Sequence, residues 1–128
     1  MERKDKLGIL ILDDEPIVVR RLKPALEKMG YEVETFTRSA DALARIEEKD
    51  FDIVITDLKM EGVDGMTFLT KVKERSPRTE VIVITGFATM NTTKESFQKG
   101  VFDFLAKPFK IAEIQEAVKR AEEKIRRS

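Results

Sequence analysis

Three short apolar runs constrain the fold of this chain more than any other feature. They cover residues 7–12, 53–55 and 81–84, and each is rich in Leu, Ile or Val without polar alternation. Runs of this kind are typical of strands that are covered on both faces, as in a parallel sheet. Two further runs, residues 31–36 and 101–105, contain polar residues and suit strands at or near a sheet edge. The sequence therefore predicts five strands.

Helical patterns separate these runs, with apolar residues three or four positions apart. They cover residues 16–29, 40–48, 65–75, 91–99 and 111–126. The fourth pattern is rich in Thr, has a poor helix propensity and is a candidate mobile element. Strand–helix alternation repeated five times requires right-handed crossovers and a parallel sheet with helices on both faces. We therefore predict one domain over residues 1–128, a doubly wound (βα)5 α/β sandwich with a five-stranded parallel sheet.

The charge balance and the missing residue types exclude several classes of function. The 128 residues include 24 Lys or Arg and 24 Asp or Glu, and this zero net charge argues against a nucleic-acid or anionic-membrane binder. The chain has no Cys and no His, which excludes disulfides, thiolate or imidazole metal ligands and a phosphohistidine. The apolar run at residues 7–12 is too short for a membrane span or a signal sequence, so we expect a cytoplasmic protein.

Ionisable or hydroxyl side chains follow four of the five predicted strands. In doubly wound sheets, functional residues collect just beyond the carboxyl ends of the strands. The residues at these positions are Asp13, Asp14 and Glu15 after the first strand, Thr56 and Asp57 after the third, Thr85 after the fourth, and Lys107 after the fifth. We expect their side chains to lie together at one edge of the sheet.

The residue types at this edge indicate phosphoryl transfer. Clustered carboxylates repel one another unless a cation lies among them, and oxygen ligands without His or Cys select Mg²⁺ or Mn²⁺ rather than zinc. Magnesium keeps several waters and is commonly completed by a phosphate oxygen. A lysine and a threonine hydroxyl opposite the metal would bind the remaining phosphoryl oxygens. One of the aspartates would then accept the phosphoryl group.

At these positions the chain resembles a response-regulator receiver domain of bacterial two-component signalling, over nearly its full length. The matching residues are Asp13-Asp14, Asp57, Asp64-Gly65, Thr85-Gly86, Phe104 and Lys107-Pro108. Residues 100–109 are most similar to the receivers of nitrogen-regulator-type transcription activators. The resemblance implies a flavodoxin-like or CheY-like fold. It also implies a signalling domain that catalyses only its own phosphorylation, rather than an enzyme with other substrates.

The resemblance implies a role for each carboxylate. Asp57 would accept a phosphoryl group from the phosphohistidine of a sensor histidine kinase. Mg²⁺ would be bound directly by Asp14, Asp57 and the backbone carbonyl of Lys59. Asp13 would act on the metal mainly through water.

The resemblance also implies a switch. Lys107 would pair with Asp57 and then with the phosphoryl oxygens, and a cis bond to Pro108 would aim it into the pocket. Thr85 would turn inward to bind the phosphoryl group, and Phe104 would follow into the vacated space. The change would reach the face formed by the fourth helix, the fifth strand and the fifth helix, which would bind a second copy or an output domain.

The chain departs from the family pattern near the acceptor. Glu61 stands where a proline is common and adds another carboxylate. Lys59 and Phe87 lie two residues after Asp57 and Thr85, at positions that the resemblance associates with the rate of water attack on the acyl phosphate. A lysine and a bulky aromatic residue there suggest slow autodephosphorylation.

Other functions remain open on the residues alone. A Mg²⁺-dependent phosphohydrolase would use Asp57 as its nucleophile, but such enzymes generally have an acid two residues later, where this chain has Lys59. A flavin- or dinucleotide-binding module would need a glycine-rich loop where Asp13 and Asp14 stand. A scaffold that is never phosphorylated is a third alternative. For Phe104, an ordinary core position is the alternative to a moving residue.

Overall fold

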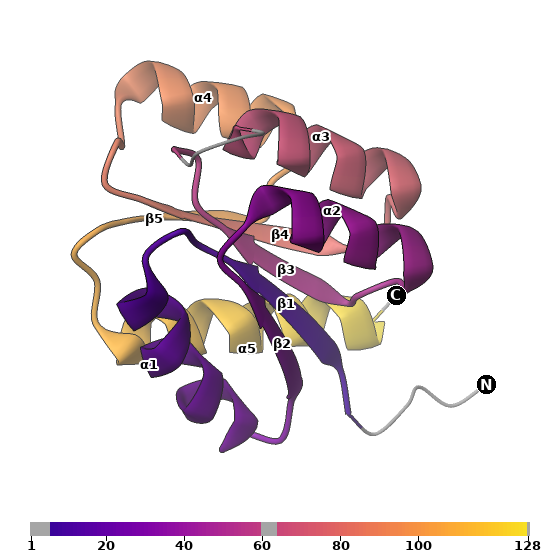
Figure 1. The fold of residues 1–128 in the computed structure, drawn as a ribbon. Helices are drawn as coiled ribbons and strands as arrows, with labels where there is room; N and C mark the ends of the chain where they lie inside the picture. Colours follow the sequence, from indigo (N-terminus) through magenta and orange to yellow (C-terminus); the bar gives the residue numbers. More distant parts are fainter. Residues whose placement is uncertain (1–5, 60–63, 128) are drawn as a thin grey trace.

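The computed structural model describes residues 6–59 and 64–127, along which strands alternate with helices (Figure 1). The elements are β1 (Gly8–Leu12), α1 (Pro16–Glu27), β2 (Glu32–Phe36), α2 (Ser39–Glu48), β3 (Ile53–Thr56), α3 (Gly65–Arg75), β4 (Glu80–Thr85), α4 (Met90–Gln98), β5 (Asp103–Ala106) and α5 (Ile111–Arg127). This order confirms the predicted alternation. Glu61 lies outside the described residues.

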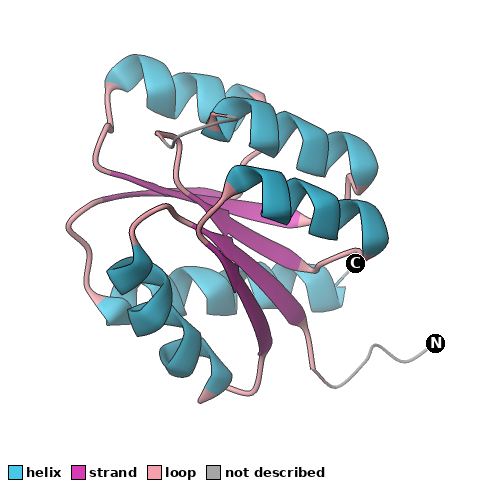
Figure 2. Cartoon of the chain, viewed as in Figure 1, coloured by secondary structure: helices cyan, strands magenta, loops and turns pink. Residues whose placement is uncertain are grey.

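The sheet is parallel throughout, with the strand order β2-β1-β3-β4-β5 (Figure 2). The chain runs from β1 outward to β2 and then crosses to β3 on the other side of β1, so the direction of winding reverses there. Helices α1 and α5 cover one face, and α2, α3 and α4 cover the other (Figure 1). This is the predicted doubly wound fold. Its switch point, where such sheets usually bind ligands, lies at the carboxyl ends of β1 and β3.

Successive residues of the central strands pack on opposite faces of the sheet. In β1, Ile9 and Ile11 join the core formed with α1 and α5, whereas Leu10 and Leu12 join the core formed with α2 and α3. All four side chains are fully buried. A strand covered on both faces has no solvent-facing position for polar residues, which explains why the apolar runs do not alternate.

Two element boundaries differ from the predicted ones by two residues, and the others by one at most. Helix α1 ends at Glu27 rather than residue 29, because the next residues form tighter turns and Gly30 has a left-handed φ of 99°. Strand β5 begins at Asp103 rather than residue 101. The N–H of Val101 donates instead to the carbonyl of Ser96 (3.1 Å), and this bond closes the end of α4.

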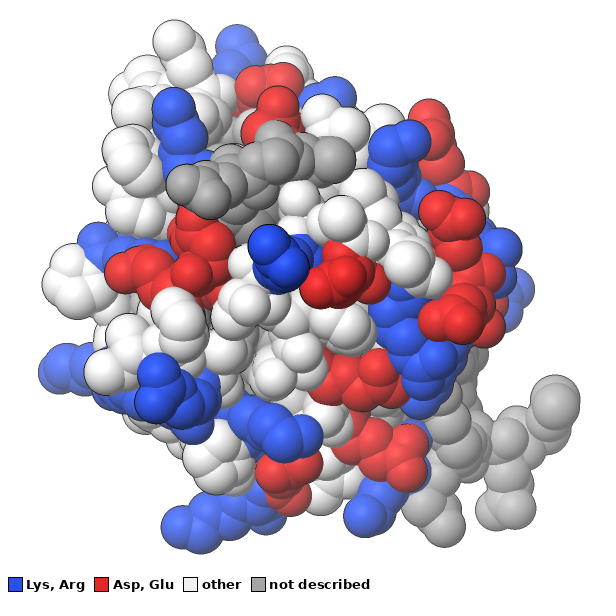
Figure 3. All heavy atoms as spheres, viewed as in Figure 1, with Lys and Arg blue, Asp and Glu red and all other residues white. Residues whose placement is uncertain are grey.

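Acidic and basic side chains are mixed over the face of the molecule shown in Figure 3, in keeping with their equal numbers in the sequence. A mixed surface of this kind produces no broad electrostatic field of one sign on that face. Among the described residues, no helix is long and apolar enough to cross a membrane.

Candidate functional site

Backbone hydrogen bonds hold the predicted site residues at the carboxyl edge of the sheet. The N–H of Asp13 donates to β2, that of Asp57 to β1 and that of Lys107 to β4, at 3.1, 3.1 and 2.8 Å. Each bond extends the pairing of the strands by one residue, so the side chains start from fixed positions along the same edge. The structure brings the three residues together, as the sequence predicts.

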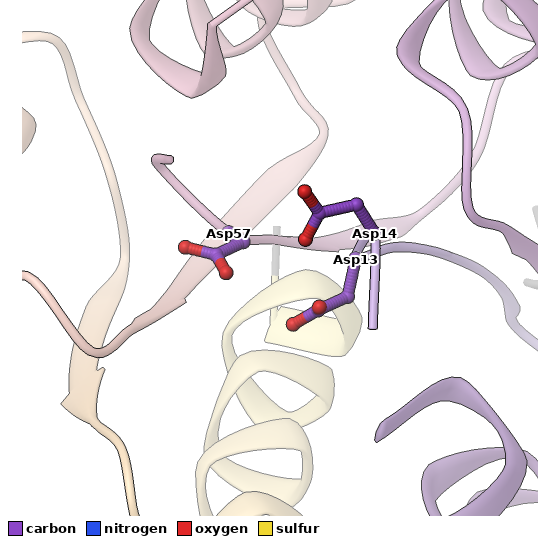
Figure 4. A group of neighbouring side chains, drawn as sticks. All are labelled: Asp13, Asp14 and Asp57. Atoms are coloured by element: carbon purple, nitrogen blue, oxygen red, sulfur yellow. The ribbon is translucent and has the colours of Figure 1, made fainter. Parts of the chain in front are cut away.

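The carboxylates of Asp13, Asp14 and Asp57 form one cluster (Figure 4). One oxygen from each residue lies within 4.8 Å of the others. Asp13 is fully buried and Asp57 nearly so, whereas Asp14 is exposed. Asp13 Oδ2 is buried and accepts no hydrogen bond of good geometry from the described residues. Hard oxygen ligands that include a buried oxygen without a hydrogen bond fit a divalent cation of the Mg²⁺ or Mn²⁺ kind.

Both carboxylate oxygens of Asp57 are oriented by neighbouring donors. Oδ1 accepts the N–H groups of Leu58 (2.6 Å) and Lys59 (3.2 Å), which belong to the loop after β3. Oδ2 accepts a hydrogen bond from Lys107 Nζ at 2.9 Å. The carboxylate is therefore held in one orientation at the end of a central strand, beside the other two acids.

Lys107 is paired with three carboxylates. Its Nζ lies 2.9 Å from Asp57 Oδ2, 2.8 Å from Asp13 Oδ2 and 2.6 Å from Glu15 Oε1. Burial opposes the charge of the ammonium, but the three carboxylates outweigh burial and raise the pKa of Lys107. The lysine is therefore a cation at any physiological pH. The peptide bond from Lys107 to Pro108 is cis.

The contact between Glu15 and Lys107 is one that sequence reasoning missed. Its position directly after Asp14 placed it near the edge of the sheet, but spacing does not reveal where a long side chain at a helix start will point. Glu15 is the N-cap of α1, yet its side chain makes no capping hydrogen bond. It reaches Lys107 instead, 92 residues further along the chain.

Burial raises the pKa of the Asp13 carboxyl group. The ammonium of Lys107 and the N–H of Glu15, which donates to Asp13 Oδ1 at 2.9 Å, oppose this rise, whereas the charge of Asp57 adds to it. Ionised Asp13 is thus disfavoured both by burial and by a neighbouring negative charge. A cation bound beside it would relieve both effects.

The loop after Asp57 packs closely on the start of α3 at Gly65. The N–H of Gly65 donates to the carbonyl of Leu58 at 2.9 Å, and a Cβ on Gly65 would overlap the backbone of Asp57 and Leu58. Asp64, the N-cap of α3, accepts the N–H of Thr67 at 2.9 Å. The predicted Asp64-Gly65 pair therefore begins α3 and allows the helix to approach the loop of the acceptor.

Thr85 and Phe104, which are predicted to move on phosphorylation, lie on the neighbouring strands β4 and β5. Thr85 is fully buried, and its Oγ1 accepts the N–H of Phe87 at 3.0 Å. Phe104 is partly buried against the core on the α2 and α3 face. Lys59 Nζ lies 5.3 Å from the centre of the Phe87 ring, which links the loops after β3 and β4. The movement and the slow autodephosphorylation stay predictions.

The family model of the response regulator receiver domain matches residues 9–119. The chain belongs to this family. The matched range includes every predicted site residue, from Asp13 to Pro108. Receiver domains are the signalling domains of two-component response regulators, and they interact with histidine kinases. The predicted function of a signalling receiver domain is therefore confirmed. Domains of this family are signalling domains and not enzymes with other substrates.

Curated relatives of this receiver are transcription regulators. It is 32% identical over 118 residues to the transcriptional regulatory protein ZraR of Salmonella typhimurium, covering 92% of this chain and 27% of that protein. It is 33% identical over 113 residues to the DNA-binding transcriptional regulator NtrC of Escherichia coli, covering 88% and 24%. The chain thus spans about a quarter of the length of these relatives. They confirm the predicted similarity to nitrogen-regulator-type activators.

Solved receiver structures have the same fold. A CheY-like response regulator receiver domain protein from Methanospirillum hungatei is 28% identical, with a TM-score of 0.90 over 94% of this chain and 97% of that one. The beryllofluoride-activated NtrC4 receiver domain dimer is 34% identical, with a TM-score of 0.86 over 92% and 98%. The predicted CheY-like fold is therefore confirmed.

Proposed function

We propose that this receiver accepts a phosphoryl group on Asp57 from the phosphohistidine of a sensor histidine kinase. The position of Asp57 supports this most directly. Its side chain is 6% exposed at the end of a central strand, lies beside two other acids and has its Oδ2 2.9 Å from Lys107 Nζ. A nucleophile held in one orientation, next to a cation that can bind the incoming group, is what phosphoryl transfer requires.

In the transfer step, a carboxylate oxygen of Asp57 bonds to phosphorus while the phosphorus–nitrogen bond of the phosphohistidine breaks. The electron pair of that bond stays on the imidazole nitrogen, which takes up a proton. Lys107 would donate hydrogen bonds to the phosphoryl oxygens, and Thr85 would add its hydroxyl. Their charge and dipole would stabilise the negative charge of the transferred group.

Asp14 and Asp57, with the backbone carbonyl of Lys59, would hold Mg²⁺, and Asp13 would contact it through water. Mn²⁺ would substitute. When bound, the metal ion neutralises negative charge on the phosphoryl oxygens. The three carboxylates of the cluster would otherwise repel an anionic donor, so we expect phosphorylation to require the metal.

Phosphorylation would change the α4–β5–α5 face, the surface formed by these three elements. Thr85 would exchange the N–H of Phe87 for the phosphoryl group, and Phe104 would follow. Met90 and Phe97 lie seven residues apart on α4 and are 87% and 47% exposed, so a partner can cover them. We propose a second copy or an output domain as this partner. We further propose that the receiver domain spans residues 1–128, is cytoplasmic and binds neither nucleic acid nor membranes directly.

The test is the intact mass of the protein after treatment with acetyl phosphate, with and without Mg²⁺. We expect a gain of one phosphoryl group that depends on Mg²⁺ and is abolished in Asp57→Asn. Asp50→Asn serves as a matched control, because this side chain is exposed and lies 3.4 Å from Arg75 on the surface. It should be phosphorylated like the wild type.

Three outcomes would contradict the proposal. No mass gain in any condition would favour a scaffold that is never phosphorylated. Rapid consumption of acetyl phosphate without any labelled protein would favour a phosphohydrolase. An equal mass gain in Asp57→Asn would place the acceptor at another residue.

A further inference from the structure

Glu15 differs from the other two carboxylates around Lys107 in its exposure to solvent. The side chains of Asp13 and Asp57 are 0% and 6% exposed, whereas that of Glu15 is 57% exposed. Water can therefore replace Lys107 as the partner of Glu15. The two aspartates would instead be left buried without a counter-charge, which is strongly unfavourable. Of the three contacts, the contact to Glu15 is the easiest to break.

The side chain of Glu15 contacts Lys107 instead of capping its own helix. The residue is the N-cap of α1 without a side-chain capping hydrogen bond, and its Oε1 lies 2.6 Å from Lys107 Nζ. Its backbone N–H is bonded to Asp13 Oδ1 at 2.9 Å, which fixes the residue beside the carboxylate cluster. The contact therefore joins the loop after β1 to the loop after β5.

A phosphoryl group on Asp57 would draw on the donors of Lys107. An ammonium group has three N–H donors. Lys107 Nζ donates to Asp57 Oδ2 and to Glu15 Oε1, and it lies 2.8 Å from Asp13 Oδ2 as an ion pair. Phosphorylation transfers the donor of Asp57 to a phosphoryl oxygen. Exposure indicates that the contact released for a second phosphoryl oxygen is that of Glu15.

We propose that Glu15 is a positioning residue that holds Lys107 in the unphosphorylated receiver, and that a phosphoryl oxygen takes its place. The inference rests on the proposed phosphorylation of Asp57. Glu15 then lowers the affinity of the resting site for a phosphoryl group, because its contact with Lys107 must be broken first.

The test is the affinity for beryllofluoride, the ligand that activates the similar NtrC4 receiver. Binding is measured by fluorine NMR at a fixed Mg²⁺ concentration. Glu15→Gln should bind it about 2- to 5-fold more tightly than the wild type and react with acetyl phosphate faster by a similar factor, the size expected for one exposed ion pair. Glu15→Asp, whose shorter side chain draws the carboxylate away from Lys107, should behave like Glu15→Gln.

Glu47→Gln is the matched control, since it removes the same charge from an exposed position on α2. Its affinity should equal that of the wild type. A Glu15 that only stabilised the fold would affect the free and the bound receiver equally, so an unchanged or weaker affinity in Glu15→Gln would overturn the inference. Wild-type behaviour of Glu15→Asp would overturn it too, because charge without contact would then suffice. A wild type that is never phosphorylated would contradict the proposed function instead.

Discussion

Helices α4 and α5 lie on opposite faces of the sheet and are held there by different forces (Figure 1). The buried residues of α5 form an apolar stripe, namely Ile114, Ala117, Val118, Ala121 and Ile125. In α4 the buried residue is the polar Ser96, and the large apolar side chains of Met90 and Phe97 face solvent. Burial of one large aliphatic side chain contributes roughly 1.5–3 kcal/mol, so α5 is anchored far more firmly than α4.

The hydroxyl groups of α4 stabilise the helix without attaching it to the sheet. Thr89 and Thr92 form a capping box, and the hydroxyls of Thr93 and Ser96 donate to carbonyls four residues earlier, each at 2.8 Å. Such bonds preserve the helix when it shifts as a unit. Because α4 follows the loop that carries Phe87, a movement of Thr85 would reach α4 before α5. Helix α4 is thus the element that the proposed phosphorylation would move most easily.

The largest expected effect comes from removing one apolar side chain from each helix and comparing the two variants. Ile114→Ala should lower the free energy of unfolding by about 2–5 kcal/mol, because Ile114 is fully buried and its removal leaves a cavity. Met90→Ala, at a position 87% exposed, should change it by less than about 0.5 kcal/mol. Urea denaturation measures both values. Similar losses in the two variants would mean that α4 is packed as firmly as α5.

Much of this contrast can be predicted from the sequence. The stripe of α5 and the Thr-rich composition of α4 are visible as patterns, because burial selects apolar residues at helical spacing. The meeting of Asp57 with Lys107 can also be predicted, since the carboxyl ends of parallel strands share one edge. The first prediction depends on residue spacing and composition, and the second on the order of parallel strands.

Features that depend on the path of a single side chain or turn could not be predicted. The contact from Glu15 to Lys107 depends on which rotamer a long, exposed side chain adopts across 92 residues of separation. The late start of β5 depends on Val101, whose apolar side chain suits a strand while its N–H closes α4. Composition and spacing carry no information on either choice.

A smaller test concerns the capping box of α4. Thr89→Ala removes the acceptor for the N–H of Thr92 (3.0 Å), at a cost of about 0.5–2 kcal/mol to the helix. Since few apolar contacts hold α4, we expect the loss as faster hydrogen exchange of its amides, with α5 unchanged. Glu113→Ala is the matched change at the start of α5, where Glu113 accepts the N–H of Lys110 at 2.7 Å. It should accelerate exchange in α5 much less, and equal acceleration would contradict the comparison.

The smallest effect concerns a polar contact that ties α5 to Tyr31, the residue before β2. Burial opposes ionisation of Glu122, but hydrogen bonds from Tyr31 (2.6 Å) and Arg126 (2.7 Å) outweigh it and lower the pKa of its carboxyl group. A carboxyl group whose pKa is lowered by folding stabilises the folded state at pH values above its unfolded pKa, which is near 4.3. This stabilisation is lost as the pH falls through the folded pKa. At neutral pH, Glu122→Gln should therefore cost up to about 1 kcal/mol, the usual size for a partly exposed pair.

Below pH 4 the difference between the wild type and Glu122→Gln should shrink, because protonated Glu122 resembles glutamine in charge. Urea denaturation at pH 7, 5, 4 and 3 measures this convergence. Glu123→Gln is the matched control, as an exposed neighbour with the same change of charge, and its difference from the wild type should stay near zero throughout. A Glu122→Gln difference that stayed constant with pH would show that the carboxylate charge does not help to hold α5. The apolar stripe would then account for the whole contrast with α4.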